Sequence, residues 1–101
     1  MSYSVVFTPE AEEHLVALYR YIATEASPAV AEKFTTAIAE CCEGLANFPH
    51  RSVRRDDIRQ GLCVTNYKGR VVIAYTVEAA LVSIVGIYYG GRDSEALLES
   101  P

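Results

Sequence analysis

Residues 7–34, FTPEAEEHLVALYRYIATEASPAVAEKF, contain two helix starts of the same kind, and these starts decide the fold. In each of them a hydroxyl residue stands directly before a proline, Thr8 before Pro9 and Ser27 before Pro28. A Ser or Thr at the N-cap accepts a hydrogen bond from a free backbone N–H, and proline at the first helical position loses no hydrogen bond. We therefore predict one helix that begins at Pro9 and a second that begins at Pro28.

Each predicted helix has one apolar face, because its apolar residues recur at helical spacing. On the first helix these residues are Ala11, Leu15, Leu18 and Ile22, with Tyr19 beside them. On the second helix they are Val30, Phe34, Ile38, Cys41, Leu45 and Phe48, and Pro49 ends the segment. Only about three residues separate the two helices, which predicts an antiparallel helical hairpin.

Strand-like runs lie on both sides of this hairpin. One short run precedes it and three longer ones follow, rich in Val, Ile and Tyr. They are YSVVF (3–7), LCVTNY (62–67), RVVIAYTV (70–77) and LVSIVGIYY (81–89). The links between the last three runs are so short that these strands must be antiparallel.

The order of elements predicts a single α+β domain over residues 1–101, with the arrangement β-α-α-β-β-β. The helical hairpin should pack on one face of a mainly antiparallel sheet. Asp93 resembles an N-cap, so we also expect a short helical turn near the C-terminus. The other face of the sheet is either exposed or covered by a partner.

The composition is that of a cytoplasmic protein. Half of the residues are hydrophobic, the longest apolar runs are too short to span a membrane, and the N-terminus lacks the features of a signal peptide. The cysteines, Cys41, Cys42 and Cys63, have no metal-ligand spacing, and we expect reduced, mostly buried thiols. We expect neither a metal site nor a cofactor.

Charge divides the chain into three blocks. Residues 1–48 hold seven acidic and two basic residues, and residues 71–101 hold four acidic residues and one basic residue. Residues 49–70 hold six basic and two acidic residues, although the whole chain has a net charge of −4. The segment FPHRSVRRDDIRQGL (48–62) therefore supplies much of the only cationic surface that the chain can form.

The ordered set of FTPEAEEHLVALYRYI, ASPAVAEKF, FPHRSVRRDDIRQGL and the ending VVIAYTVE…VSIVGIYYGGRD resembles the RelE/ParE superfamily of type II toxins, over nearly the whole chain. The arginine segment and YYGGRD are more similar to its ParE-like branch. The resemblance implies a toxin that inhibits DNA gyrase by protein–protein binding. It also implies a cognate antitoxin, of the ribbon-helix-helix type, as a second partner. Two alternatives stay open: a RelE-like, ribosome-dependent mRNA endonuclease that needs no metal, and a non-toxic remnant that only binds an antitoxin.

For target recognition we expect Arg54, Arg55 and Arg59, with Arg92 as a neighbour at the end of the last strand. The alternative is that these arginines pair locally with Asp56, Asp57 or acids on the helices, Arg59 being the one expected to hold the loop.

In the nuclease alternative the catalytic set would be Arg54, Arg59, Arg70, Tyr88 and Tyr89. A nuclease of this kind must hold polyanionic RNA, and the acidic balance of the chain disfavours that role, although a local cationic patch can still bind phosphate. Tyr88 and Tyr89 should point to opposite faces of the sheet. We expect His14 and His50 to lie away from the end of the last strand.

For antitoxin binding we expect apolar and aromatic residues of the first helix and the sheet. The residues are Leu15, Tyr19, Ile22, Tyr75 and Tyr88. The antitoxin segment should lie along the hairpin and the sheet, partly as an apolar helix.

Overall fold

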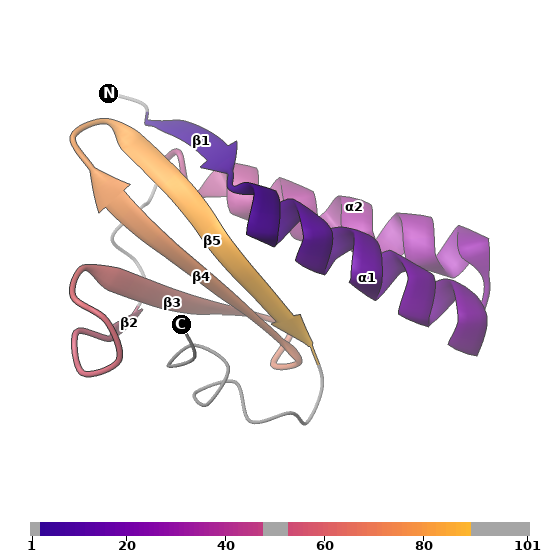
Figure 1. The fold of residues 1–101 in the computed structure, drawn as a ribbon. Coiled ribbons are helices and arrows are strands. Elements are labelled where there is room, and N and C mark those ends of the chain that lie inside the picture. Colours follow the sequence, from indigo (N-terminus) through magenta and orange to yellow (C-terminus); the bar gives the residue numbers. More distant parts are fainter. Residues whose placement is uncertain (1–2, 48–52, 90–101) are drawn as a thin grey trace.

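The computed structural model describes residues 3–47 and 53–89. The predicted order β-α-α-β-β-β is confirmed, with one additional short strand after the helices (Figure 1). The elements are β1 (Ser4–Phe7), α1 (Pro9–Glu25), α2 (Pro28–Gly44), β2 (Val53–Arg54), β3 (Leu62–Tyr67), β4 (Val71–Glu78) and β5 (Leu81–Tyr89). The helical turn that we expect after Asp93 lies outside the described residues.

Both helices begin where the sequence predicts. Thr8 Oγ1 accepts a hydrogen bond from the Ala11 N–H at 3.2 Å, and Ser27 Oγ accepts one from the Val30 N–H at 3.2 Å. The helices lie side by side and cover one face of the sheet (Figure 1).

The sheet has the strand order β1-β5-β4-β3-β2. The three neighbouring pairs from β2 to β5 are antiparallel, whereas β1 runs parallel to β5. The helical hairpin makes this parallel pairing possible, because it returns the chain to the end of the sheet from which β1 started. The sheet is therefore mainly antiparallel, as predicted.

The short strand β2 belongs to the segment for which we expected a loop. Val53 and Arg54 pair with Val64 and Cys63 at the outer edge of β3. The Arg55 N–H extends this contact by donating to the Leu62 carbonyl oxygen at 2.8 Å. The sequence of β2 has no alternation that would reveal a strand, and the exposed edge of β3 supplies its hydrogen bonds.

The core lies between the helices and the sheet. Ile38, Ile73, Tyr75 and Ile84 are all fully buried there. Cys42 is also fully buried. This burial is the first cause of its raised pKa, about 12, to which the charges of Cys41 and Glu43 contribute.

Two expectations about the face of α2 are wrong. We expected Cys41 in the apolar stripe, but it is only half-buried at the margin of the core, and its neighbour Cys42 is the fully buried thiol. We also expected Val30 in the apolar stripe, yet half of it is exposed. The reason is a rotation of the helix: its buried side is centred on Ala31, Ile38 and Cys42.

Candidate binding surfaces

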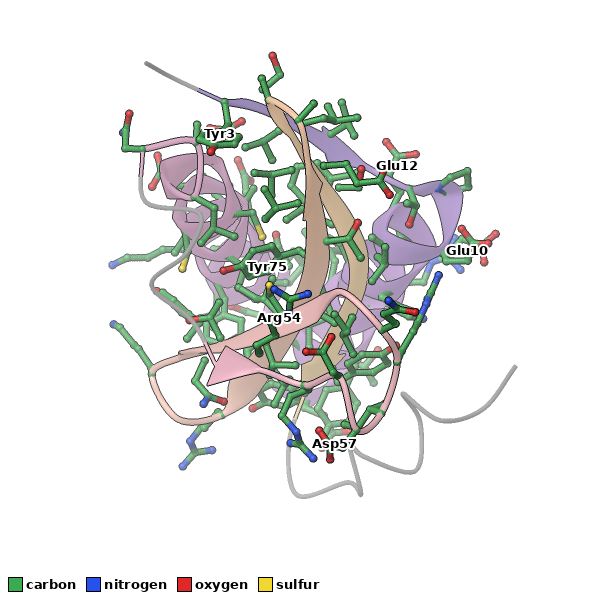
Figure 2. The ribbon with its side chains drawn as sticks, turned by 90° about the vertical axis from the view of Figure 1, so that its left-hand side faces the viewer. Tyr3, Glu10, Glu12, Arg54, Asp57 and Tyr75 are labelled. Atoms are coloured by element: carbon green, nitrogen blue, oxygen red, sulfur yellow. The ribbon has the colours of Figure 1, made fainter. Side chains whose placement is uncertain are left out.

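The arginine loop, residues 54–61, contains two local ion pairs. Arg54 Nε lies 2.9 Å from Asp56 Oδ2. Arg55 binds Asp57 with two hydrogen bonds, of 3.0 Å from Nε and 2.9 Å from a terminal guanidinium nitrogen. Figure 2 shows Arg54 and Asp57 on this loop, and Glu10 and Glu12 on the separate surface of α1. Two of the loop's positive charges are thus paired within the loop itself.

Asp56 also holds the shape of the loop. Its Oδ1 accepts a hydrogen bond of 2.8 Å from the Gly61 N–H, and Gly61 has the left-handed φ of 79° that glycine adopts readily. This backbone hydrogen bond and, next, the neighbouring Arg54 keep the pKa of Asp56 below its ordinary value. The hydrogen bonds from Arg55 do the same for the pKa of Asp57.

The two paired arginines differ in exposure. The Arg54 side chain is 68% exposed and the Arg55 side chain is 25% exposed. Local pairing therefore applies to Arg54 and Arg55, and the expectation that Arg59 is the arginine that holds the loop is wrong. Within residues 3–47 and 53–89, Arg59 forms no ion pair. Arg92 lies outside the described residues.

The charge of Arg59 instead acts on Tyr88 of β5. Burial raises the pKa of the Tyr88 hydroxyl above its ordinary value of 10.0, and the positive charge of Arg59 opposes this increase. The Tyr88 ring lies over Gly86, where an added Cβ would be only 2.7 Å from the ring carbons. The absence of a side chain at Gly86 therefore leaves the space that the Tyr88 ring occupies.

His14 joins this group from α1. Its Nδ1 accepts a hydrogen bond of 3.2 Å from the Ile87 N–H, and its ring centroid lies 5.1 Å from that of Tyr88. The expectation that His14 lies away from the end of the last strand is wrong. Because β1 pairs only with residues 81–84 of β5, α1 can reach the rest of that strand edge. His50 lies outside the described residues.

The residues expected to form a nuclease active site do not lie at one place. Arg59 and Tyr88 come together, but Tyr89 points to the opposite face, where it contacts Tyr21 and Phe34. Arg70 lies in the turn between β3 and β4. Sequence reasoning missed His14, although its position three residues after the buried Ala11 placed it beside the buried face of the helix.

The residues expected to bind an antitoxin also lie at different places in the fold. Ile22 and Tyr75 are buried in the core, with exposed fractions of 8% and 0%, so they cannot contact a partner in this conformation. Leu15 is partly buried against the core, whereas Tyr19 is exposed on α1. Tyr88 belongs to the other surface, beside Arg59. In the described part of the chain, no group of three or more His, Cys, Asp or Glu residues could hold a metal ion.

Comparisons with known proteins agree with this fold. The model of a family described as "ParE toxin of type II toxin-antitoxin system, parDE" matches residues 5–94. The chromosomal ParDE toxin-antitoxin system of P. aeruginosa contains a chain with 19% identity and a TM-score of 0.77, over 88% of this chain and 97% of that chain. The toxin-antitoxin complex RelBE2 from Mycobacterium tuberculosis contains a chain with 20% identity and a TM-score of 0.65, over 88% of this chain and 99% of that chain. No curated protein matches the sequence.

Proposed function

Because the chain belongs to the ParE toxin family of type II toxin-antitoxin systems, we propose that it inhibits DNA gyrase by binding it and that a cognate antitoxin neutralises it. In this proposal the antitoxin has a ribbon-helix-helix domain and a further segment that covers the toxin. The toxin meets both partners in the cytoplasm and needs neither metal nor cofactor. Among the described residues, neither α1 nor α2 has the length and hydrophobicity of a membrane-spanning helix.

The observation that carries the gyrase proposal is the exposure of Arg59. Its side chain has no ion pair among the described residues, and its charge acts on the nearby hydroxyl of Tyr88. Arginine and tyrosine are enriched at the centres of protein interfaces, where they combine apolar area with directed hydrogen bonds. A guanidinium group on an otherwise acidic protein favours one orientation toward a negatively charged surface, such as gyrase or the DNA bound to it.

The other arginines have supporting roles in the proposal. Arg54 is exposed, and because exposed ion pairs are weak it can exchange Asp56 for a carboxylate or phosphate of the target. Arg55 is less exposed and is doubly bound to Asp57, so it chiefly maintains the loop. Arg92 remains a proposed neighbour of this surface.

We expect Arg59→Ala to abolish toxicity in bacteria and to weaken gyrase inhibition in a supercoiling assay by about tenfold or more. The matched control is Arg20→Ala, which removes the same charge from an exposed position on α1. Both variants should keep the melting temperature of the wild type. Equal toxicity of the two variants would contradict the assigned role of Arg59, and wild-type toxin that leaves gyrase fully active would contradict the proposed target.

Messenger RNA cleavage is the second candidate function, because His14 contacts Tyr88 and the charge of Arg59 acts on the Tyr88 hydroxyl. The local chemistry argues against it. Nδ1 of His14 already accepts the Ile87 N–H, and the raised pKa of Tyr88 keeps its hydroxyl protonated at neutral pH, so neither group is a ready base. Intact mRNA in a translation assay with the wild-type toxin would exclude this candidate, whereas unimpaired growth during expression would favour the non-toxic remnant.

A further inference from the structure

The end of the sheet where β3 and β5 finish carries a row of aromatic rings. Tyr67 and Tyr89 are the register partners of Val71 on its two sides, so they lie at the same end of the sheet (Figure 1). The Phe34 ring centroid lies 5.9 Å from that of Tyr67 and 5.8 Å from that of Tyr89. The Tyr21 ring continues the row, 6.0 Å from Tyr89. We call these four rings, which come from two helices and two strands, the aromatic row.

The aromatic row does more than close the end of the core. Phe34, Tyr67 and Tyr89 are half-buried against the core, as expected for rings that seal the space between helices and sheet. Tyr21 differs from them, because it is 52% exposed and is the most exposed large hydrophobic side chain in the described part of the chain. An exposed ring that is held by a neighbouring ring offers a face on which a planar group can stack.

Three cationic side chains border the aromatic row. Lys68 Nζ lies 5.6 Å from the centroid of the Tyr67 ring, Arg70 belongs to the same turn, and Lys33 directly precedes Phe34 on α2. All three cations are exposed, and none of them is ion-paired with another residue of the ranges 3–47 and 53–89. They include both lysines of the chain.

Two acidic residues are close to the aromatic row in the sequence. Glu25 lies one turn after Tyr21 at the end of α1. Glu32, two residues before Phe34, lies on the opposite side of α2, because two residues turn a helix by about 200°. Three cations and one carboxylate therefore border the row. This end of the molecule can attract a polyanion although the chain as a whole is acidic.

We propose that the aromatic row binds single-stranded DNA. Unpaired bases stack on Tyr21 and its neighbouring rings, and Lys33, Lys68 and Arg70 bind the phosphates. Proteins that hold single strands without reading their sequence combine aromatic rings and cations in this way. An acidic peptide would leave the rings without a stacking partner, and a duplex would keep its bases from them. The choice of DNA rests on the proposed function, because gyrase acts on DNA, and the inference goes beyond that function by assigning a second surface to the nucleic acid itself.

The affinity of the purified toxin for a labelled oligothymidylate of about 15 nucleotides, measured by fluorescence anisotropy, tests the inference. We expect a dissociation constant of about 1–100 µM at physiological salt and weaker binding of a duplex of the same length. Because three cations bind phosphates, the logarithm of the association constant should fall with the logarithm of salt concentration with a slope of about −2. Tighter binding of the duplex, or of an oligouridylate RNA, would overturn the inference.

The stacking contact is tested at Tyr21, whose exposure allows substitution without loss of the fold. Tyr21→Ala should weaken DNA binding at least about fivefold, whereas Tyr21→Phe should retain it, because the ring and not the hydroxyl stacks on a base. The matched control is Tyr19→Ala, which removes an exposed tyrosine from the opposite side of α1. All three variants should keep the melting temperature of the wild type. Equal affinities of the two alanine variants would contradict stacking on the aromatic row.

The phosphate contact is tested at Lys68. Lys68→Gln should reduce the magnitude of the salt slope by about 0.7, the value for one phosphate contact on a single strand. The control Arg20→Gln removes one charge from the side of α1 that faces away from the sheet, since Leu18 and Ile22 on either side of it are buried, and should leave the slope unchanged. An unchanged slope in both variants would overturn the inference.

The inference and the proposed function can fail separately. A toxin that inhibits gyrase but does not bind the oligothymidylate overturns the inference and leaves the proposed function standing. DNA binding that depends on Tyr21 and Lys68, in a toxin that leaves gyrase active, supports the inference and overturns the proposed target.

Discussion

At the scale of single residues, His14 replaces a neighbouring strand as the hydrogen-bond acceptor for a backbone N–H of β5. Beyond Ile84 the edge of β5 has no partner from β1, and the Ile87 N–H on that edge donates to His14 Nδ1. A polar backbone group that loses its partner when partly buried costs free energy. His14 therefore joins α1 to β5 in addition to its contact with Tyr88.

We expect His14→Ala to lower the free energy of unfolding by about 1–2 kcal/mol, because the Ile87 N–H then has no acceptor. His14→Asn should recover part of this loss, since the Asn oxygen is attached at the same atom of the side chain as Nδ1. Denaturation in urea measures both variants. Equal stability of the Ala and Asn variants would show that the ring contact, and not the hydrogen bond, is what matters.

At the scale of elements, the arginine loop holds its own shape, and in our proposal it also recognises the target. Asp56 and Asp57 pair with Arg54 and Arg55, and Asp56 also binds the Gly61 N–H, while Arg59 forms no ion pair among the described residues. The charge that is available to a partner is therefore smaller than the sequence suggests. The position of this available charge is also more closely defined.

The loop should respond to acid through Asp56. Its pKa is lowered in the folded protein, so the stabilisation is present above the ordinary value of 3.8 and is lost as pH falls through the lowered pKa. We expect the Gly61 amide to lose its protection from hydrogen exchange in that range. At neutral pH, Asp56→Ala should increase Gly61 exchange by roughly threefold or more, whereas Asp56→Asn, which keeps an acceptor oxygen, should change it less. Unaltered Gly61 protection in the Ala variant would contradict this account.

At the scale of the whole molecule, charged residues define the surfaces and buried residues hold the domain together. The acidic hairpin and the cationic loop are parts of one small sheet-and-helix domain, which therefore carries surfaces of opposite charge. The core that holds these surfaces together contains buried thiols, and all three cysteines are free.

Cys42 should report on the stability of the whole domain, because only extensive unfolding exposes it. Its pKa is raised to about 12, so its stabilising contribution is complete below the ordinary value of 9.0 and is lost as pH rises from there toward 12. At pH 8 we expect an alkylating reagent to modify the half-buried Cys41 in the native protein and Cys42 only in denaturing urea. Mass spectrometry distinguishes the two sites. Rapid native labelling of Cys42 would contradict its place in the core.

The sequence by itself determined the two helices, the four longer strands and their order, but not the short strand β2. Thr8-Pro9 and Ser27-Pro28 act through hydrogen bonds only a few residues long, and the turn at Lys68-Gly69 fixes antiparallel pairing through its shortness. It also determined the separation of charge along the chain, because neighbours in the sequence remain neighbours in the fold. These features depend on local chemistry and need no knowledge of distant contacts.

Only the tertiary structure decided which side chains meet. The parallel pairing of β1 with β5 brings His14 to Ile87, which lies 73 residues away in the sequence. The rotation of α2 buried Cys42 and left Cys41 half-buried, and packing in the core removed Ile22 and Tyr75 from any partner surface. Helical and strand periodicities tell which residues share a face. The direction in which that face points depends on the packing of all the elements together.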